Sequence, residues 1–404
     1  MRRTRPLRLP LAVSAAVACL LLLAACEDPS GVGLTVLDPT ASDPQARTLP
    51  VDSAAFTDSE ELTGAFLTDP GFQDFRGLAG RVEDPTFGTT TAYGYFDVLE
   101  PQNFDGFGDQ PIEEATLRLR RTYAYGDTMS TTRLDVRQIA EEWTAVGAVA
   151  DTLFPVQDDI ITSFDVAPGD SLIEIDLPES WIEANDTTLR SEDFSTIFHG
   201  FRLDPSDEAS AVYGFAGSST LRLISEGDTV VYQVSEVFSG IEGPADPPTD
   251  EALWRLQDGT GRGLELQFDL DTLAQSAVNT VRLRVNADTA AATTDLPPGF
   301  VRPFARRLAL FGFVEDQDPV LITVADLDEE TETFTFRSAV LDDVFQDLLL
   351  GRSEVEGFVL GFPATPSSLD VLPLVRSSEP GCAEDDAMPC EGPRAVVILI
   401  PPDA

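Results

Sequence analysis

Short segments in which apolar and polar residues alternate recur along much of this 404-residue chain. A period of two residues is typical of strands that bury one face and expose the other. Glycine- and proline-containing stretches separate the segments, as they do between the strands of antiparallel sheets. The segments that we expect to be strands include residues 112–120, 134–139, 219–224, 229–234, 263–270, 278–285, 333–336 and 395–400. The pattern predicts a mainly β fold.

Two segments have a helical period instead. In the second half of the chain, five apolar residues fall on one face at helical spacing, Asp342 lies in the first turn, and Gly351 follows the end. The first half has a shorter candidate, residues 178–185, with Trp181 and Ile182 facing inward. The five apolar residues are Leu341, Val344, Phe345, Leu348 and Leu349. We therefore expect one short covering helix on each of two β-domains.

The second half of the chain repeats the order of features found in the first half. Equivalent segments are strands 112–120 and 278–285, strands 134–139 and 308–313, Gly-Phe segments 197–201 and 357–362, and hairpins 219–234 and 371–400. Such self-similarity indicates a duplicated structural unit.

A proline-rich stretch separates the two halves, and prolines are excluded from the interior of a sheet. We therefore predict two tandem antiparallel β-sandwich domains, residues 54–242 and 254–404, joined by a linker at residues 243–253.

The N-terminus has the layout of a secretory signal peptide, with basic residues, an apolar run and small residues before Cys26. The final residues, Leu23-Ala24-Ala25-Cys26, resemble the lipobox of bacterial lipoproteins. That resemblance implies removal of residues 1–25 and acylation of Cys26 with fatty chains such as palmitate. Two or three chains on one residue are enough for stable membrane anchoring. Residues 26–53 would then form a lipidated tether.

The residues after the cysteine bear on localisation. The acidic pair Glu27 and Asp28 resembles the surface-export signal of Bacteroidota-type lipoproteins. We expect a lipid anchor in the cell outer membrane, with the periplasmic and the surface face both open.

The charge balance is strongly acidic. Asp and Glu number 70 against 26 Lys and Arg, which gives a formal net charge of -44, and every basic residue is an arginine. Such a surface disfavours nucleic acid and anionic lipid as partners. Because molar salt screens charge repulsion, we expect the folded state to become more stable as NaCl is added, as in proteins of salt-loving bacteria.

Two cysteines remain after Cys19 leaves with the signal peptide and Cys26 takes the lipid. In an oxidising compartment, Cys382 and Cys390 are expected to form a disulfide. A metal site would need more ligands than these two thiols.

Catalytic chemistry has few candidates. His199 is the only histidine and lies beside Phe198 in a predicted strand, which favours a structural role, and the absence of lysine excludes Schiff-base chemistry. A carboxylate pair for hydrolysis would be one of many among 70 acids. We expect no cofactor. The acidic loops 204–208 and 326–330 are candidates for a structural calcium ion, although neither matches an EF-hand.

Aromatic residues bear on glycan binding, because exposed rings stack on sugars. Trp143 and Trp254 are the candidates for such stacking, and packing inside a core is the alternative for each.

Several short motifs resemble known families. Residues 31–37 (GVGLTVL), 84–92 (DPTFGTTTA) and 256–263 (LQDGTGRG) resemble motifs of the Bacteroidota lipoprotein family labelled domain of unknown function 4270, from which this chain departs at Asp258. Residues 112–143 also resemble the DNRLRE-type β-sandwich modules, which include carbohydrate-binding modules. Neither resemblance implies an activity.

These observations favour a non-enzymatic, lipid-anchored envelope protein that binds another envelope protein or serves a structural role. A glycan-binding surface lipoprotein is the first alternative. A secreted hydrolase that uses a carboxylate pair is the second.

Overall fold

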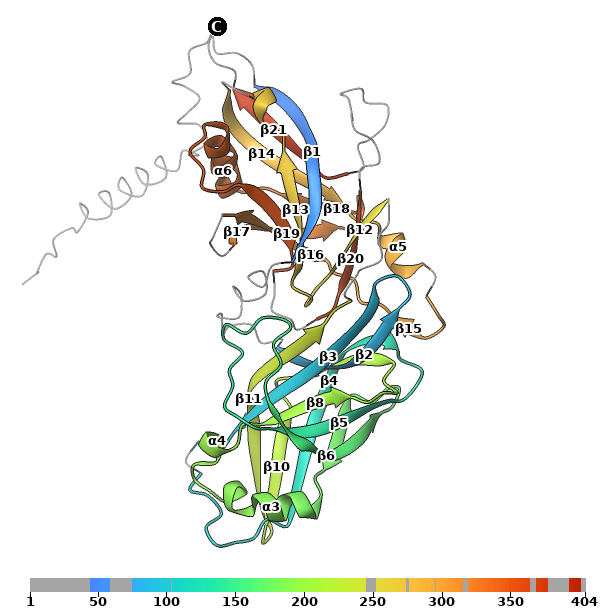
Figure 1. Cartoon of the computed structure of the whole chain (residues 1–404), viewed down its shortest axis with the longest axis vertical. Helices are drawn as coiled ribbons and strands as arrows, with labels where there is room; N and C mark the ends of the chain where they lie inside the picture. Colours follow the sequence, from blue (N-terminus) through green and yellow to red (C-terminus); the bar gives the residue numbers. More distant parts are fainter. Residues whose placement is uncertain are drawn as a thin grey trace, which may run out of the picture.

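The computed structural model describes residues 44–58, 75–102, 104–244, 252–273, 276–294, 296–314, 319–363, 368–376 and 392–400. Two β-units lie end to end along the long axis of the molecule (Figure 1). The prediction of a mainly β fold with antiparallel sheets and a few short helices is confirmed.

Unit 1 contains the strands from β2 to β11. Its elements are β2 (Arg76–Asp84), β3 (Gly88–Leu99), β4 (Glu114–Asp127), β5 (Thr132–Ile139), β6 (Val156–Val166), β7 (Leu172–Asp176), α3 (Glu179–Leu189), α4 (Phe194–Ile197), β8 (Phe201–Pro205), β9 (Ala211–Ala216), β10 (Thr220–Ser225) and β11 (Asp228–Glu242). Hydrogen-bonded neighbours follow the order β11-β10-β4-β9-β2-β3-β8-β5-β6, β7 pairs with β4, and β11 also pairs with β3.

Unit 2 combines the first strand of the structure with the C-terminal half of the chain. Its elements are β1 (Gln45–Asp58), β12 (Leu253–Gln257), β13 (Arg262–Phe268), η2 (Asp271–Leu273), β14 (Ala277–Asn286), α5 (Thr289–Thr293), β15 (Phe300–Val301), β16 (Arg307–Phe313), β17 (Val320–Asp328), β18 (Thr333–Phe336), α6 (Ala339–Leu349), β19 (Gly357–Gly361), β20 (Val371–Val375) and β21 (Arg394–Ile400). Eight strands close into a barrel in the order β1-β13-β19-β16-β17-β18-β14-β21.

Six strand pairings of unit 1 have a counterpart in unit 2. The pairs β4–β7, β4–β10, β5–β6, β5–β8, β3–β8 and β2–β9 of unit 1 match β14–β18, β14–β21, β16–β17, β16–β19, β13–β19 and β12–β20 of unit 2. The duplication inferred from the sequence is therefore present in the topology.

The last strand of each unit has a different origin. In unit 1, β11 pairs first with β10 and then with β3, and its register shifts between Val234 and Glu236, where it passes from one partner to the other. In unit 2, β1 pairs first with β21 and then with β13, and its register shifts between Val51 and Ser53. Strand β1 thus occupies in unit 2 the position that β11 occupies in unit 1 (Figure 1).

Three sequence predictions need correction on this point. The sequence predicts a tether that includes residues 45–53, but these residues are part of β1, and residues 54–58 belong to unit 2 and not to the first domain. The predicted hairpin at residues 371–400 is also wrong, because β20 pairs with β12 and β21 pairs with β14 and β1. Strand β21 corresponds to β10 of unit 1.

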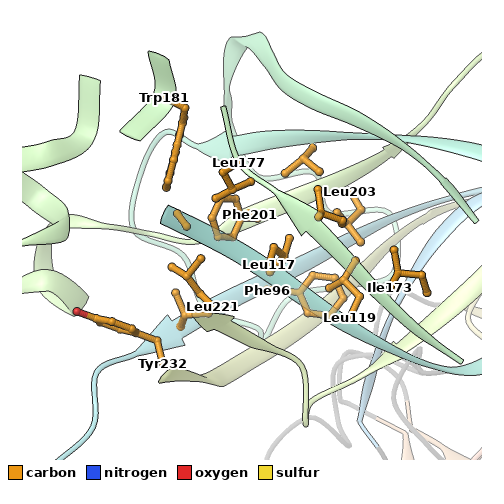
Figure 2. Packing of buried hydrophobic residues seen from close by; sticks show 14 of the residues in the cluster. Phe96, Leu117, Leu119, Ile173, Leu177, Trp181, Phe201, Leu203, Leu221 and Tyr232 are labelled. Carbon is orange, nitrogen blue, oxygen red and sulfur yellow. The ribbon is translucent and has the colours of Figure 1, made fainter. Parts of the chain in front are cut away.

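Each unit has its own apolar core. Figure 2 shows part of the core of unit 1, in which Trp181 of α3 packs beside Phe201 of β8 with 5.8 Å between ring centroids. In unit 2, α6 buries Leu341 and Phe345, and its Asp342 carboxylate accepts a hydrogen bond from the Val281 amide of β14 at 2.6 Å. Both predicted helices therefore cover the units as expected.

Candidate functional site

The richest polar site in the described residues is the junction between the two units. It begins with the turn between β2 and β3, where the Asp84 carboxylate accepts hydrogen bonds from the amides of Thr86 at 2.7 Å and Phe87 at 2.8 Å. Gly88 follows with a φ of 88°, a backbone conformation that favours glycine. Contacts within the turn therefore help to orient the carboxylate.

An arginine from unit 2 completes this site. Arg302 follows β15, which pairs with the end of β4 and so joins unit 2 to unit 1. Its Nε and Nη2 atoms each lie 2.7 Å from an oxygen of Asp84, and both side chains are fully buried. The Tyr125 hydroxyl donates to the same carboxylate at 2.8 Å, and Arg302 Nη1 donates to the Ala292 carbonyl at 2.9 Å.

The second motif singled out in the sequence reaches the same junction. Gln257 accepts a hydrogen bond from the Thr90 hydroxyl at 3.3 Å, across 167 positions of the chain. Gly259 has a φ of 75°, and a Cβ atom built there would lie 2.7 Å from Ile241 Cδ1 and 2.8 Å from the Ser368 carbonyl. Residues 84–92 and 256–263 therefore meet where the two units pack together.

Buried acids lie beside these contacts. The Asp258 carboxylate accepts a hydrogen bond from the Ser368 hydroxyl and another from the Gly259 amide, the latter at 2.8 Å. Burial, reinforced by the Asp370 carboxylate, raises the pKa of Asp258 to about 8. Burial also raises the pKa of Asp370. Asp258 is thus held largely in its protonated, neutral form at neutral pH.

Apolar residues from both units surround the polar contacts. Tyr123 of unit 1 accepts a hydrogen bond from the Leu369 amide at 2.9 Å, and the Arg76 guanidinium lies 5.3 Å from the centre of its ring. The buried apolar residues are Leu78, Val82, Phe87, Ala92, Tyr125, Val212, Ile241, Leu369 and Val371. Because this cluster is continuous across the boundary, the junction resembles the interior of a domain more than a linker.

The two tryptophans proposed for glycan stacking are buried. Trp143 packs against Tyr95 and Phe154, and its indole NH donates to the His199 carbonyl at 2.8 Å. Trp254 lies in the core of unit 2, and Arg376 covers its ring at 5.8 Å. Each exposes 8% of its surface, so the stacking prediction is wrong, since neither offers a ring face to a ligand.

In the acidic loops proposed for calcium, the carboxylates form ion pairs with arginines or accept hydrogen bonds within turns. Asp204 forms ion pairs with Arg202 and Arg137, and Asp326 with Arg307. The Asp328 carboxylate accepts from the amides two and three positions further along the chain. In the described part of the chain, no three His, Cys, Asp or Glu residues lie close enough together to hold a metal ion.

Three other predicted site residues, Cys26, Cys382 and Cys390, lie outside the described residues. Among the described helices, none is long and apolar enough to span a bilayer.

One open hollow of about 420 Å³ lies beside the junction. Its walls come from β4, the β6–β7 turn and β15, and the lining residues are Arg121, Thr122, Tyr123, Ala124, Thr128, Gly169 and Val301. The lining includes no carboxylate and no tryptophan. It therefore lacks both the paired acids of a glycosidase and the broad ring surface of a sugar-binding groove.

Comparisons with known proteins assign no family. No family model matches the chain, and no curated protein matches it. The resemblance to the domain of unknown function 4270 family is therefore not supported by a family match. Among solved structures, the N-terminal CBM22-1-CBM22-2 tandem domain from Paenibacillus barcinonensis Xyn10C is 10% identical over 90% of this chain and 95% of that chain, with a TM-score of 0.11. A score at that level carries no argument about fold or function.

Sequence reasoning found the motifs of the junction but not their role. It treated residues 84–92 and 256–263 as family motifs, without a partner for either. Arg302 was missed altogether. The available signal was a lone arginine next to Pro303 in a loop, and nothing in the neighbouring residues indicates a partner 218 positions away.

Proposed function

We propose that this protein is a non-enzymatic, lipid-anchored envelope protein whose two rigidly joined β-units hold a binding surface away from the outer membrane. The observation that carries the proposal is the junction. A buried bidentate ion pair, a shared apolar cluster and a strand pair join the units, whereas domains on a flexible linker share small, polar contacts.

The position of β1 gives the proposed assembly a direction. Asp58, at one end of β1, pairs with Arg262 near the junction, whereas Gln45, at the other end, pairs with Leu399 far from unit 1. A lipid on Cys26 would therefore lie closest to unit 2. The 19 positions from Cys26 to Gln45 span at most about 65 Å when extended. Unit 1 would be farthest from the membrane, although its strands precede all those of unit 2 except β1 in the sequence.

A binding role fits the site chemistry better than catalysis does. The carboxylates of Asp84 and Asp258 are buried at the junction, with 4% and 7% of the residue surface exposed, so they are poorly placed to act on a substrate. The open hollow beside them offers Arg121 and a tyrosine but no acid or nucleophile pair. A partner in the envelope, and not nucleic acid, is also consistent with the net charge of -44.

Changing the lipidated residue tests the anchor. We expect Cys26→Ser to move the protein from the membrane to the soluble fraction of its native cell, because the fatty chains are then absent. The mass of the mature N-terminus in the unmodified protein provides the second measurement. An unmodified thiol at Cys26, or a mature chain that begins elsewhere, would contradict the proposal.

A further inference from the structure

The two units differ at one sheet edge. In unit 2, β18 pairs with the end of β17, through Leu327 with Phe334 and Asp328 with Thr333, which closes the barrel. In unit 1, the equivalent strands are β6 and β7. Among the described residues, β6 pairs only with β5 and β7 only with β4. The sheet of unit 1 is therefore open where that of unit 2 is closed.

Local contacts keep the two strands of unit 1 apart. The turn between them is closed by the Ala167 amide, which donates to the Asp170 carboxylate at 3.0 Å. The next residue is held to β4, because the Arg121 amide donates to the Ser171 carbonyl at 2.9 Å. Strand β7 therefore follows β4, and no strand of the described part of the chain pairs with the outer edge of β6.

The edge of β6 presents backbone groups together with charged and apolar side chains. The Arg137 guanidinium of the neighbouring strand β5 donates to the carbonyls of Gln157 and Asp158 at the beginning of β6, and the stretch considered for a partner is residues 159–165. The Ile160 side chain on β6 is 46% exposed. An added strand could cover this side chain and pair with the edge.

The charge at this edge indicates the kind of strand that fits. Asp158, Asp159 and Asp165 are exposed, and no basic residue lies on β6. Acidic side chains on an edge disfavour pairing between two copies of the same strand, since like charges would then face each other. The same side chains favour an incoming strand with lysine or arginine at alternating positions.

We propose that the open edge of β6 binds an extended, positively charged segment of another envelope protein, which adds to the sheet as a further strand. This inference rests on the proposed function, because it names the partner chemistry of the binding surface that unit 1 presents away from the membrane. The internal precedent is β18, which the chain itself adds to the equivalent edge of unit 2.

The test uses the full chain in detergent and two synthetic peptides of equal charge. One peptide alternates lysine and valine over eight residues, and the other replaces two central valines with proline, which cannot complete a strand ladder. We expect the first peptide to bind at physiological ionic strength and the second to bind at least tenfold more weakly. Equal binding of both peptides would overturn the proposal, since attraction by charge alone would explain it.

Two matched variants locate the binding. Replacing Asp159 and Asp165, the two acids in residues 159–165 of β6, with arginine is expected to weaken binding of the lysine–valine peptide about tenfold, and replacing both with asparagine to weaken it less. The control replaces Asp207 and Glu208 with arginine, an equal charge change on the exposed β8–β9 turn, and is expected to leave binding unchanged. An equal loss in the control, or a dimer that buries β6 before peptide is added, would contradict the proposal.

These outcomes are independent of the anchor. A chain with an unmodified Cys26 that still binds the peptide at β6 would overturn the proposed membrane attachment and leave the edge site intact. A lipidated chain that fails to bind the lysine–valine peptide would overturn the edge site and leave the proposed membrane attachment intact.

Discussion

The two units share six equivalent strand pairings, but the strand that completes each unit has a different origin. Unit 1 closes locally, because β10 and β11 are joined by a tight turn at Glu226 and Gly227. Unit 2 closes with β1, which pairs Arg47 with Val397 from the opposite end of the chain. Pairing between strands joined by a short turn forms early and at low entropic cost. Pairing β1 with β21 closes a loop that contains most of the chain, so it is expected to form after the intervening strands have folded. The difference suggests that unit 2 forms only when the N-terminal strand is available.

Removing β1 should have the largest effect. Deleting residues 45–58 exposes the edges of β21 and β13 and removes the buried Leu49. We expect unit 2 to lose stability approaching that of a whole domain, about 5 kcal/mol or more, while unit 1 still unfolds cooperatively. Chemical denaturation with limited proteolysis of each half measures this. The control deletes residues 27–43, and an equal loss in that chain would contradict the role assigned to β1.

The next largest effect is expected at the junction. Arg302→Ala leaves the Asp84 carboxylate buried without its charge partner, and such a change typically destabilises a protein by about 3–5 kcal/mol. Arg307→Ala breaks a pair whose side chains are 60% and 72% exposed, so a loss of about 0–1 kcal/mol is expected. Denaturant midpoints compare the two variants. Similar losses for both would mean that the buried pair does not hold the units together.

The stability of the folded chain should depend on pH because of Asp258, a buried acid at the junction. The pKa of Asp258 is raised from 3.8 to about 8, so between these values the folded state keeps a proton that the unfolded chain releases. The contribution of Asp258 to the free energy of unfolding is therefore fully present at low pH and is lost as the pH rises to 8. Asp97 adds a similar loss at lower pH, because burial raises its pKa to about 6.

Asp258→Asn should flatten this slope, because the neutral amide imitates the protonated acid. At pH 8 we expect the variant to be more stable than the native chain, on the order of a few kcal/mol. Thermal unfolding followed from pH 6 to 8 is the measurement. A variant that keeps the native slope over this range would show that other groups cause it.

The smallest expected difference in stability is that between alanine substitutions at two glycines with positive φ. Gly259 lies at the junction with φ 75°, and an added methyl would meet Ile241 and the Ser368 carbonyl. Gly227 lies in the β10–β11 turn with φ 89° and has nothing within 4 Å of an added methyl. Both substitutions to alanine pay the backbone cost of about 1–2 kcal/mol, and Gly259→Ala should lose about 1–3 kcal/mol more through overpacking. Equal melting temperatures would indicate a loosely packed junction.

The features that sequence predicted correctly are local ones. Alternation identified β4, β5, β10 and β14, and helical spacing identified α6, because each pattern is set by burial of one face of a single element. The order of these elements also revealed the duplication, since both units use the same neighbours.

The features that sequence missed depend on distant partners. Among the residues of β1 whose burial the structure describes, Leu49 alone is buried, and Pro50 follows it, so the strand lacks the alternation of a half-buried strand. Its partners lie more than 200 positions away. The burial of Trp143 likewise depends on Tyr95 and Phe238, which come from other strands. The role of Arg302 depends on its ion pair with Asp84, and no local sequence pattern connects the two residues.

Amide hydrogen exchange of residues 45–58 in the full chain tests the central claim most directly. If β1 closes unit 2, its amides are protected to a similar degree as those of its partners β13 and β21, because all three open together. Exchange of residues 45–58 at the rate of an unstructured chain, with β13 and β21 still protected, would show that this segment is a tether and would contradict the account.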